Sequence, residues 1–185
     1  MLDALGDDVR ARRDRALLLI GWAGGFRSSE LTGLDPSDVE EVREGLILHL
    51  RRSKTDQTGQ DRKIGIPLGR TRHCPVMALA AWLETLKESH GKIFRRVDRH
   101  GNVCGRFLRA DSVSTILRDR LSRAGIDPLG YSGHSLRAGL VTSAIKAGVP
   151  TYKVRAQTGH ASDLMLARYV RDAGLFDGNA VGVLL

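Results

Sequence analysis

The chain has 185 residues, 42% of them hydrophobic, which is enough for one domain with a full core. Its 29 Lys and Arg against 21 Asp and Glu give a formal charge of +8, which suits a polyanion, although ribosomal or membrane-surface binding would explain that charge equally well. No apolar run approaches the ~20 residues of a membrane span, no signal-peptide order is present, and Cys74 and Cys104 lack metal-ligand spacing, so we expect a cytoplasmic protein with reduced thiols.

The first half of the chain predicts helices on either side of a β-hairpin. A Gly-Gly pair is a helix stop, a polar turn between two apolar stretches is typical of a hairpin, and proline is tolerated at a first helical position. In chain order the expected elements are a helix over residues 7–23, a second helix from Ser28, strands over residues 46–50 and 62–67, and a long helix from Pro75.

The second half predicts helices, apart from one arginine-rich stretch that we expect to be a loop or a small hairpin around His100. That stretch is either a solvated basic loop or a set of phosphate contacts along a duplex, and the basic character of the chain favours the second interpretation. The elements expected here are that stretch over residues 94–110, a helix capped by Asp111 and Ser112, a helix from Gly133, a short helix over residues 151–157, and a last helix carrying Tyr169.

A set of six residues suits the chemistry of a phosphodiester. His134 and Arg137 stand three apart, so they share one face of a helix. Arginine presents a planar fork of donors that stays charged at any working pH, which matches the non-bridging oxygens of a phosphate. A phenol attacks phosphorus once cations or a base ease the loss of its proton. The set, in chain order, is Arg27, Lys54, His134, Arg137, His160 and Tyr169.

Taken singly, these residues have plainer explanations. Arg27 alone is more often a surface arginine, Lys54 a solvated turn lysine, and Tyr169 a half-buried aromatic. The prediction depends on the order of the motifs: GFRSSEL, then SKT, then HSLR, then GH with a tyrosine nine positions later. In this order the motifs resemble the tyrosine recombinase (phage integrase) family over nearly the whole chain.

The resemblance implies roles for the cations and the tyrosine. Arg27, Arg137 and His160 would donate to the non-bridging oxygens of the scissile phosphate, where preorganised donors usually supply the largest part of a rate enhancement. Tyr169 would be the nucleophile, forming a 3′-phosphotyrosyl bond. The arginines would stabilise the charge and the covalent bond would store the energy, so the resemblance implies no metal ion, no other cofactor and no ATP.

Two further residues would handle protons. Lys54, near the tip of the predicted hairpin, would be the general acid that protonates the leaving 5′-oxygen. His134 would orient the nucleophile or exchange its proton. Both roles are implied by the family resemblance at matching positions of this chain.

The resemblance also implies the fold and its assembly. It predicts a mainly α domain with a small antiparallel β-sheet near residues 46–67, an α+β arrangement that the order of predicted elements supports. Residues 1–185 would form a single catalytic domain without the N-terminal helices that complete a clamp around DNA in the family. Leu166 stands where the family often has a small hydroxyl residue, which puts one helper contact in doubt. The apolar tail, residues 175–185, would dock on a neighbouring protomer or else fold back on its own core.

The expected activity is site-specific cleavage and rejoining of double-stranded DNA, as in recombination or integration. We expect a homo-tetramer assembled on DNA, from a protein that is a monomer alone. The alternatives are a type IB topoisomerase, which reseals the same strand, and a DNA-binding module without catalysis. Further phosphate contacts are expected from arginines outside the catalytic set, namely Arg51, Arg52, Arg95, Arg96, Arg99, Arg106 and Arg109.

Overall fold

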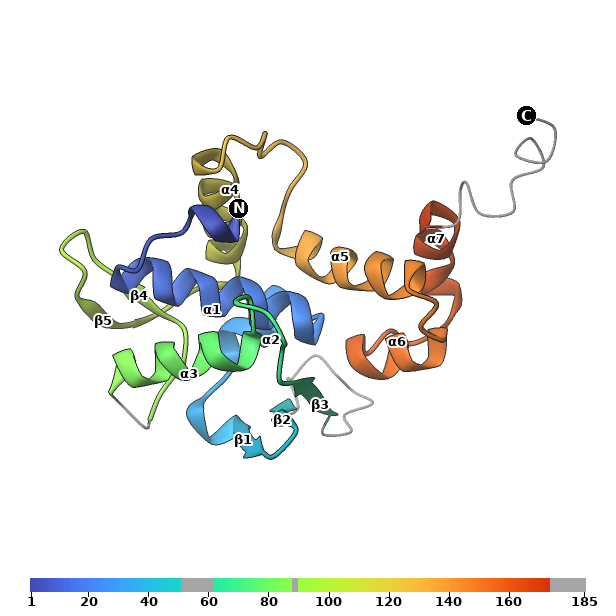
Figure 1. Cartoon of the computed structure of the whole chain (residues 1–185), viewed down its shortest axis with the longest axis horizontal. Helices are drawn as coiled ribbons and strands as arrows, with labels where there is room; N and C mark the ends of the chain where they lie inside the picture. The colour runs from blue at the N-terminus through green and yellow to red at the C-terminus, as the bar shows by residue number, and fades with distance from the viewer. Residues whose placement is uncertain (51–61, 88–89, 174–185) are drawn as a thin grey trace.

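The computed structural model describes residues 1–50, 62–87 and 90–173, with the backbone alone for residues 170–173. Over these residues it is mainly helical with two small antiparallel sheets, which confirms the predicted fold class (Figure 1). Among the described helices, none is long and apolar enough to cross a membrane. The helices are α1 (Val9–Gly24), α2 (Ser28–Gly33), α3 (Pro75–Leu86), α4 (Ala110–Arg123), α5 (Gly133–Lys146), α6 (Thr151–Thr158) and α7 (Leu164–Ala173), with 3-10 turns η1 (Leu2–Ala4) and η2 (Pro36–Asp38).

Helix α1 is the central element of the main core. The Asp8 side chain accepts a hydrogen bond from the Ala11 amide at 2.9 Å, which caps the start of the helix. Gly25 ends it in the left-handed conformation, with φ 59°, as the Gly-Gly pair predicted. Between these ends, the fully buried Leu17 and Ile20 belong to a core shared with α3 and the main sheet.

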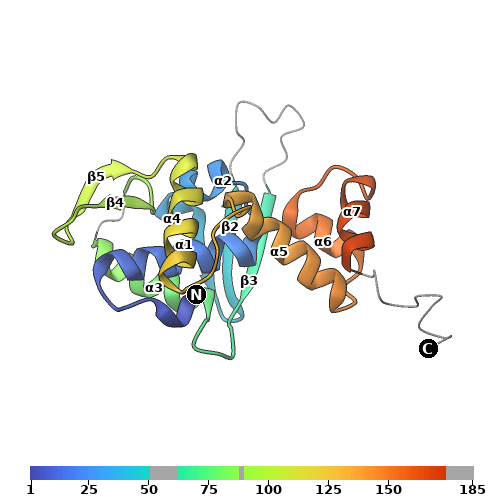
Figure 2. The ribbon, with the colours of Figure 1, turned by 90° about the horizontal axis from the view of Figure 1, so that it is seen from above.

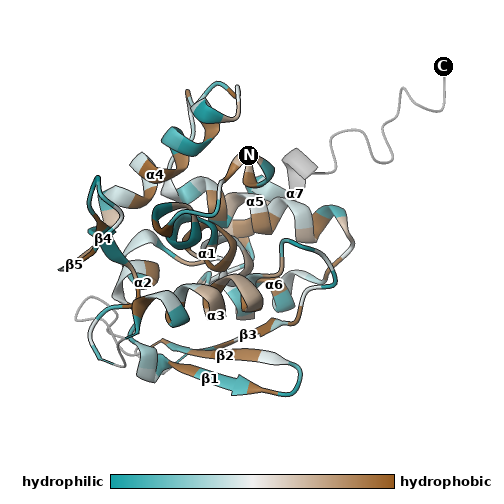
Figure 3. Ribbon diagram, turned by 60° about the vertical axis from the view of Figure 1, so that its left-hand side comes forward, coloured by the Kyte–Doolittle hydropathy of each residue, from teal (hydrophilic) through white to brown (hydrophobic). Residues whose placement is uncertain are grey.

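The main sheet has three antiparallel strands in the order β1 (Val39–Val42), β2 (Gly45–Leu50) and β3 (Arg62–Pro67). The β2–β3 pairing confirms the predicted hairpin strands and sets Leu48 opposite Ile64. Figure 3 shows the strands of this sheet beneath α3. Strand β1 was not predicted, because a four-residue edge strand whose central residues are two exposed glutamates carries almost no apolar alternation.

The second sheet is a hairpin of β4 (Arg95–Val97) and β5 (Val103–Phe107), so of the two predicted alternatives, a loop or a small hairpin, the structure has the hairpin. Its turn is closed by the Asp98 carboxylate, which accepts from the backbone amides of His100 and Asn102. Helix α4 follows, and it begins at Ala110, one residue before the predicted Asp111 and Ser112 cap. Asp111 lies instead in the first turn, where a negative charge still favours the helix N-terminus.

Helices α5, α6 and α7 form the opposite end of the molecule from the β4–β5 hairpin (Figures 1 and 2). A small second core joins the three helices through Val141, Val154 and Leu166. Leu166 is fully buried there, so the residue found where the resemblance implies a hydroxyl instead anchors α7 to its neighbours.

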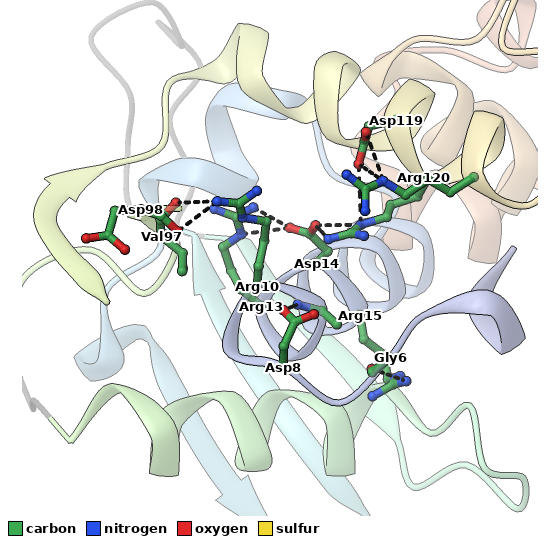
Figure 4. Close-up of polar contacts among 12 residues, drawn as sticks. Gly6, Asp8, Arg10, Arg13, Asp14, Arg15, Val97, Asp98, Asp119 and Arg120 are labelled. Atoms are coloured by element: carbon green, nitrogen blue, oxygen red, sulfur yellow. Dashed lines mark hydrogen bonds and ion pairs between the residues drawn. The ribbon is translucent and has the colours of Figure 1, made fainter. Parts of the chain in front are cut away.

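A buried ion network ties α1 to α4 and to the β4–β5 hairpin (Figure 4). Asp14 is 2% exposed, and its carboxylate lies 2.6 Å from both the Arg13 and the Arg120 guanidinium groups. Arg13 also donates to the Arg95 carbonyl at 3.2 Å, and Arg10 donates to the Asp98 carbonyl at 2.7 Å. Part of the basic charge near the N-terminus is therefore structural.

We expect Asp14→Ala to lower the free energy of unfolding by about 3–5 kcal/mol, because it leaves two buried guanidinium groups without their carboxylate. Asp7→Ala is the matched control, since the 89% exposed Asp7 side chain pairs with Arg15 at the surface and should cost under about 1 kcal/mol. Urea unfolding followed by circular dichroism measures both. Equal losses in the two variants would contradict a structural role for the buried network.

Candidate active site

Five of the six predicted catalytic residues come together where the C-terminal end of α1 meets α5, α6 and α7. Arg27 follows the end of α1, and His134 and Arg137 lie on α5. His160 follows α6, and Tyr169 lies on α7. Four parts of the prediction lie outside the described residues, namely the sixth catalytic residue Lys54, the arginines Arg51 and Arg52, and the tail of residues 175–185.

Arg137 is buried at the centre of this group, with 3% of its surface exposed. Its Nη1 donates to the Gly25 carbonyl at 2.7 Å and to the Thr158 carbonyl. Within the described structure these bonds use Nη1 alone, so the Nη2 and Nε edge can receive an oxyanion. Burial, and then the charge of Arg27, lower the pKa of Arg137 to about 10, so the group remains charged at neutral pH.

Glu30 links two arginines at one side of the site. Its Oε1 accepts from Arg27 Nη1 at 2.8 Å, and its Oε2 accepts from the Arg27 backbone amide at 2.8 Å, which caps α2. The same Oε2 lies 3.3 Å from Arg62 Nη2. Glu30 thus holds the exposed Arg27 side chain toward the cluster.

Arg62 is a site residue that the sequence analysis missed. It lies on β3, where Arg62, Ile64 and Ile66 alternate onto one face, and its Nη1 donates to the Thr158 carbonyl at 2.8 Å. That period-two alternation was the available signal, because it turns Arg62 toward the same side as two buried isoleucines.

Position 159 requires glycine both for its backbone conformation and for the space around it. Its φ of 70° is in the left-handed region, and a Cβ there would lie 1.5 Å from Arg62 Nη1. The glycine before His160 therefore makes room for a third guanidinium group beside Arg137.

His160 is 8% exposed, and its Nδ1 lies 2.7 Å from the Thr158 hydroxyl oxygen. Burial is the main cause that lowers the pKa of His160 to about 4, followed by the nearby charges of Arg137 and Arg27. The imidazole is therefore neutral at neutral pH as long as no anion occupies the site.

The Tyr169 hydroxyl lies 3.0 Å from His134 Nε2. The Tyr169 ring lies near His160, with ring centroids 6.3 Å apart and planes tilted by 56°. Tyr169 also packs against the small core that contains Leu166, which fixes the helix that carries it. A phenol beside an imidazole and several guanidinium groups is the arrangement that nucleophilic attack on an anionic ester needs.

The arginines expected to contact DNA divide into two groups. Arg95 is buried, and its guanidinium donates to the Lys92 carbonyl at 3.1 Å and to the His90 carbonyl at 2.6 Å. The expectation for Arg95 is therefore wrong in this structure, because its side chain closes the start of β4 instead of facing solvent. The exposed members are Arg96, Arg99, Arg106 and Arg109.

Among the described residues, no group of three or more His, Cys, Asp or Glu side chains could hold a metal ion. The described charges at the site are instead those of the arginines, with Glu30 between two of them.

The model of the phage integrase family matches residues 1–174. The chain belongs to this family. An integrase/recombinase XerD homolog of Selenomonas ruminantium is 36% identical over 170 residues, covering 91% of this chain and 50% of the relative. Tyrosine recombinase XerD of Mycobacterium leprae is 30% identical over 171 residues, covering 88% of this chain and 50% of the relative. This integrase-family chain thus spans about half the length of these curated relatives.

Solved structures share the fold of this phage integrase family member. The crystal structure of XerA recombinase matches with a TM-score of 0.70 at 23% identity, covering 91% of this chain and 54% of the other. XerH recombinase bound to a palindromic difH substrate, in a post-cleavage complex, matches with a TM-score of 0.72 at 19% identity, covering 99% of this chain and 49% of the other. The predicted recombinase catalytic-domain fold is thereby confirmed.

The lowered pKa of His160 predicts a pH dependence of stability in this integrase-family domain. Between its folded pKa of about 4 and the ordinary value of 6.5, the unfolded chain binds a proton that the folded chain does not. The free energy of unfolding should therefore fall as the pH is lowered through this range, by about 1.4 kcal/mol per pH unit from this group. His160→Gln should remove that contribution in urea unfolding, whereas parallel curves for the two proteins would contradict the lowered pKa.

Proposed function

We propose that this chain is the catalytic part of a site-specific DNA recombinase that cuts and rejoins strands through a 3′-phosphotyrosyl intermediate. The observation that carries the proposal is the 3.0 Å contact between the Tyr169 hydroxyl and His134 Nε2, beside the buried guanidinium of Arg137. A nucleophile, a proton partner and a preorganised anion site thus occupy one place. Family membership supports this assignment of the site.

In the proposed reaction, the Tyr169 oxygen attacks the scissile phosphorus, and its proton passes to His134 or to solvent. The bond from phosphorus to the 5′-oxygen breaks, and Lys54 protonates that oxygen as it leaves. A 5′-hydroxyl of a partner strand then attacks the phosphotyrosyl bond, which releases Tyr169 and joins a new strand. The phosphodiester is conserved at each step, so no external energy source is required.

The arginines stabilise the charge that develops on the phosphoryl oxygens. Arg137 is suited to this role, because two backbone carbonyls fix one nitrogen of its guanidinium before substrate arrives. Arg27 can pair with the second oxygen, since Glu30 holds its side chain toward the cluster. Such donors cost no reorganisation in the transition state.

Double-stranded DNA is the proposed substrate and partner, with a homo-tetramer assembled on it and the tail of residues 175–185 docked between protomers. A duplex that reaches both Tyr169 and the exposed arginines of the β4–β5 hairpin would run along the molecule, because these features lie at opposite ends (Figure 2). The names of the relatives, all recombinases or integrases, support strand exchange over the resealing of a topoisomerase. A cytoplasmic location is part of this proposal.

We expect Tyr169→Phe to abolish covalent attachment to DNA and to leave DNA binding nearly unchanged, because only the attacking oxygen is lost. A nicked suicide substrate traps the adduct on denaturing gels, and gel shifts measure binding. Tyr152→Phe is the matched control, since Tyr152 is an exposed tyrosine of α6 and its variant should form adduct like the parent. Adduct that persists in Tyr169→Phe would refute the nucleophile assignment.

We expect DNA affinity to fall steeply with salt, and a variant lacking Arg96, Arg99 and Arg106 to show a shallower dependence. Each phosphate that a cation neutralises contributes about −0.9 to the log–log slope, so alanine at all three positions should remove up to about 2.7. Arg123→Ala is the control, because Arg123 of α4 pairs with Asp119 at the surface. An unchanged slope in the triple variant would remove the hairpin from the DNA interface.

A further inference from the structure

The Thr158 side chain is fully buried between helix α6 and His160. Its hydroxyl donates to the Val154 carbonyl at 2.7 Å, the bond that threonine often makes one turn back in a helix. The same oxygen lies 2.7 Å from His160 Nδ1. One hydroxyl group therefore serves two partners at short distance.

Proton counting settles the direction of the second contact. A backbone carbonyl only accepts, and a hydroxyl has one proton, so the bond to Val154 uses the only proton that Thr158 can donate. The 2.7 Å contact to His160 is then a hydrogen bond only if Nδ1 carries the proton and Thr158 accepts it. In a neutral imidazole, a protonated Nδ1 leaves Nε2 without a proton.

We propose that Thr158 is a positioning residue that holds neutral His160 in the tautomer with the proton on Nδ1, so that Nε2 enters the site as an acceptor. The role of this tautomer in DNA cleavage rests on the function proposed above. The tautomer itself rests on the geometry of Thr158, Val154 and His160 alone.

This tautomer determines whether His160 can donate a hydrogen bond to a phosphate. Nε2 cannot donate to a phosphoryl oxygen until His160 takes up a second proton, and the cations around the imidazole oppose that proton. An anionic phosphate among those cations offsets their charge and favours protonation. The ionisable groups around the imidazole are Arg27 near α2, Arg62 of β3, His134 and Arg137 of α5, Arg155 of α6, and Tyr169 of α7.

Binding of the scissile phosphate is therefore linked to uptake of a proton at His160, and cleavage should slow as the pH rises through the value at which the occupied site loses that proton. In Thr158→Val the ring is free to place its proton on Nε2. Such a variant donates to phosphate without proton uptake, and its cleavage rate should depend less on pH.

Nitrogen-15 NMR of the full chain, labelled at histidine, tests the tautomer directly. Long-range proton–nitrogen spectra distinguish a protonated from an unprotonated ring nitrogen, and His160→Gln assigns the resonances. At pH 7 without DNA we expect a protonated Nδ1 and an unprotonated Nε2 in the parent protein. A protonated Nε2 in the parent would overturn the proposal without any variant.

Three variants separate the hydroxyl from general packing. Thr158→Val keeps the shape and removes the acceptor, so the His160 proton should move toward Nε2, while Thr158→Ser should keep the parental tautomer. Thr32→Val is the matched control, because Thr32 is a buried threonine whose hydroxyl also bonds the carbonyl one turn back, that of Ser28. Parental His160 spectra in Thr158→Val would overturn the proposal.

The pH profile of adduct formation on the nicked substrate completes the test. Parent and Thr158→Ser should lose rate with rising pH, and Thr158→Val should show a flatter profile, whereas identical profiles would overturn the proposed linkage. If the parent forms no adduct at any pH, the proposed function fails, and the NMR spectra still decide the tautomer.

Discussion

The site is organised by one guanidinium group that two helix ends hold in place. The carbonyls that accept from Arg137 belong to Gly25, which ends α1, and Thr158, which ends α6. Helix C-termini carry unsatisfied carbonyls and a partial negative charge. Two such ends compensate Arg137, so an arginine can be buried there while one edge of its fork stays available for a ligand.

Around this fixed cation, positive charge predominates among the described residues of the site. Arg27, Arg62 and Arg137 lie together with Glu30 as the carboxylate that the described structure pairs with two of them. The depressed pKa of His160 reports the resulting potential, because burial and these cations oppose a further proton. Among the described residues, the fold thus holds like charges together, which suits the anionic ester of the proposed reaction.

The sequence was informative where residue order and strong local signals coincide. The helix stop at Gly25, the β2–β3 strands and the neighbourhood of His134 and Tyr169 follow from motifs or local periodicity, and the structure has them. The sequence predicted less well which side chains are buried by contacts between distant segments. Alternation along β4 sets Arg95 on the same face as the buried Val97 and Arg96 on the other, but the sequence does not show which carbonyls the buried guanidinium would bind.

Contacts between distant segments also decide the positions of Arg62 and Thr158 in the site. Arg62 and Thr158 act through a shared carbonyl and a single hydroxyl, so their roles depend on distances between β3 and the end of α6. The alternation along β3 predicts that the Arg62 side chain points inward, but it does not predict which groups that side chain contacts. Strand β1 was missed for a different reason. Its four residues carry little strand signal of their own, and the strand forms by pairing with β2.

The small core under α7 has a consequence for motion. Among the described side chains, Val141, Val154 and Leu166 form its buried centre, whereas α1 lies in a far larger core. Segments with few buried apolar contacts open at the lowest free energy, long before the whole domain unfolds. The helix that carries Tyr169 is thus expected to be among the first parts of the described fold to detach. Under the proposed function, a modest contact from outside would then shift the population between states with the phenol in the site and out of it.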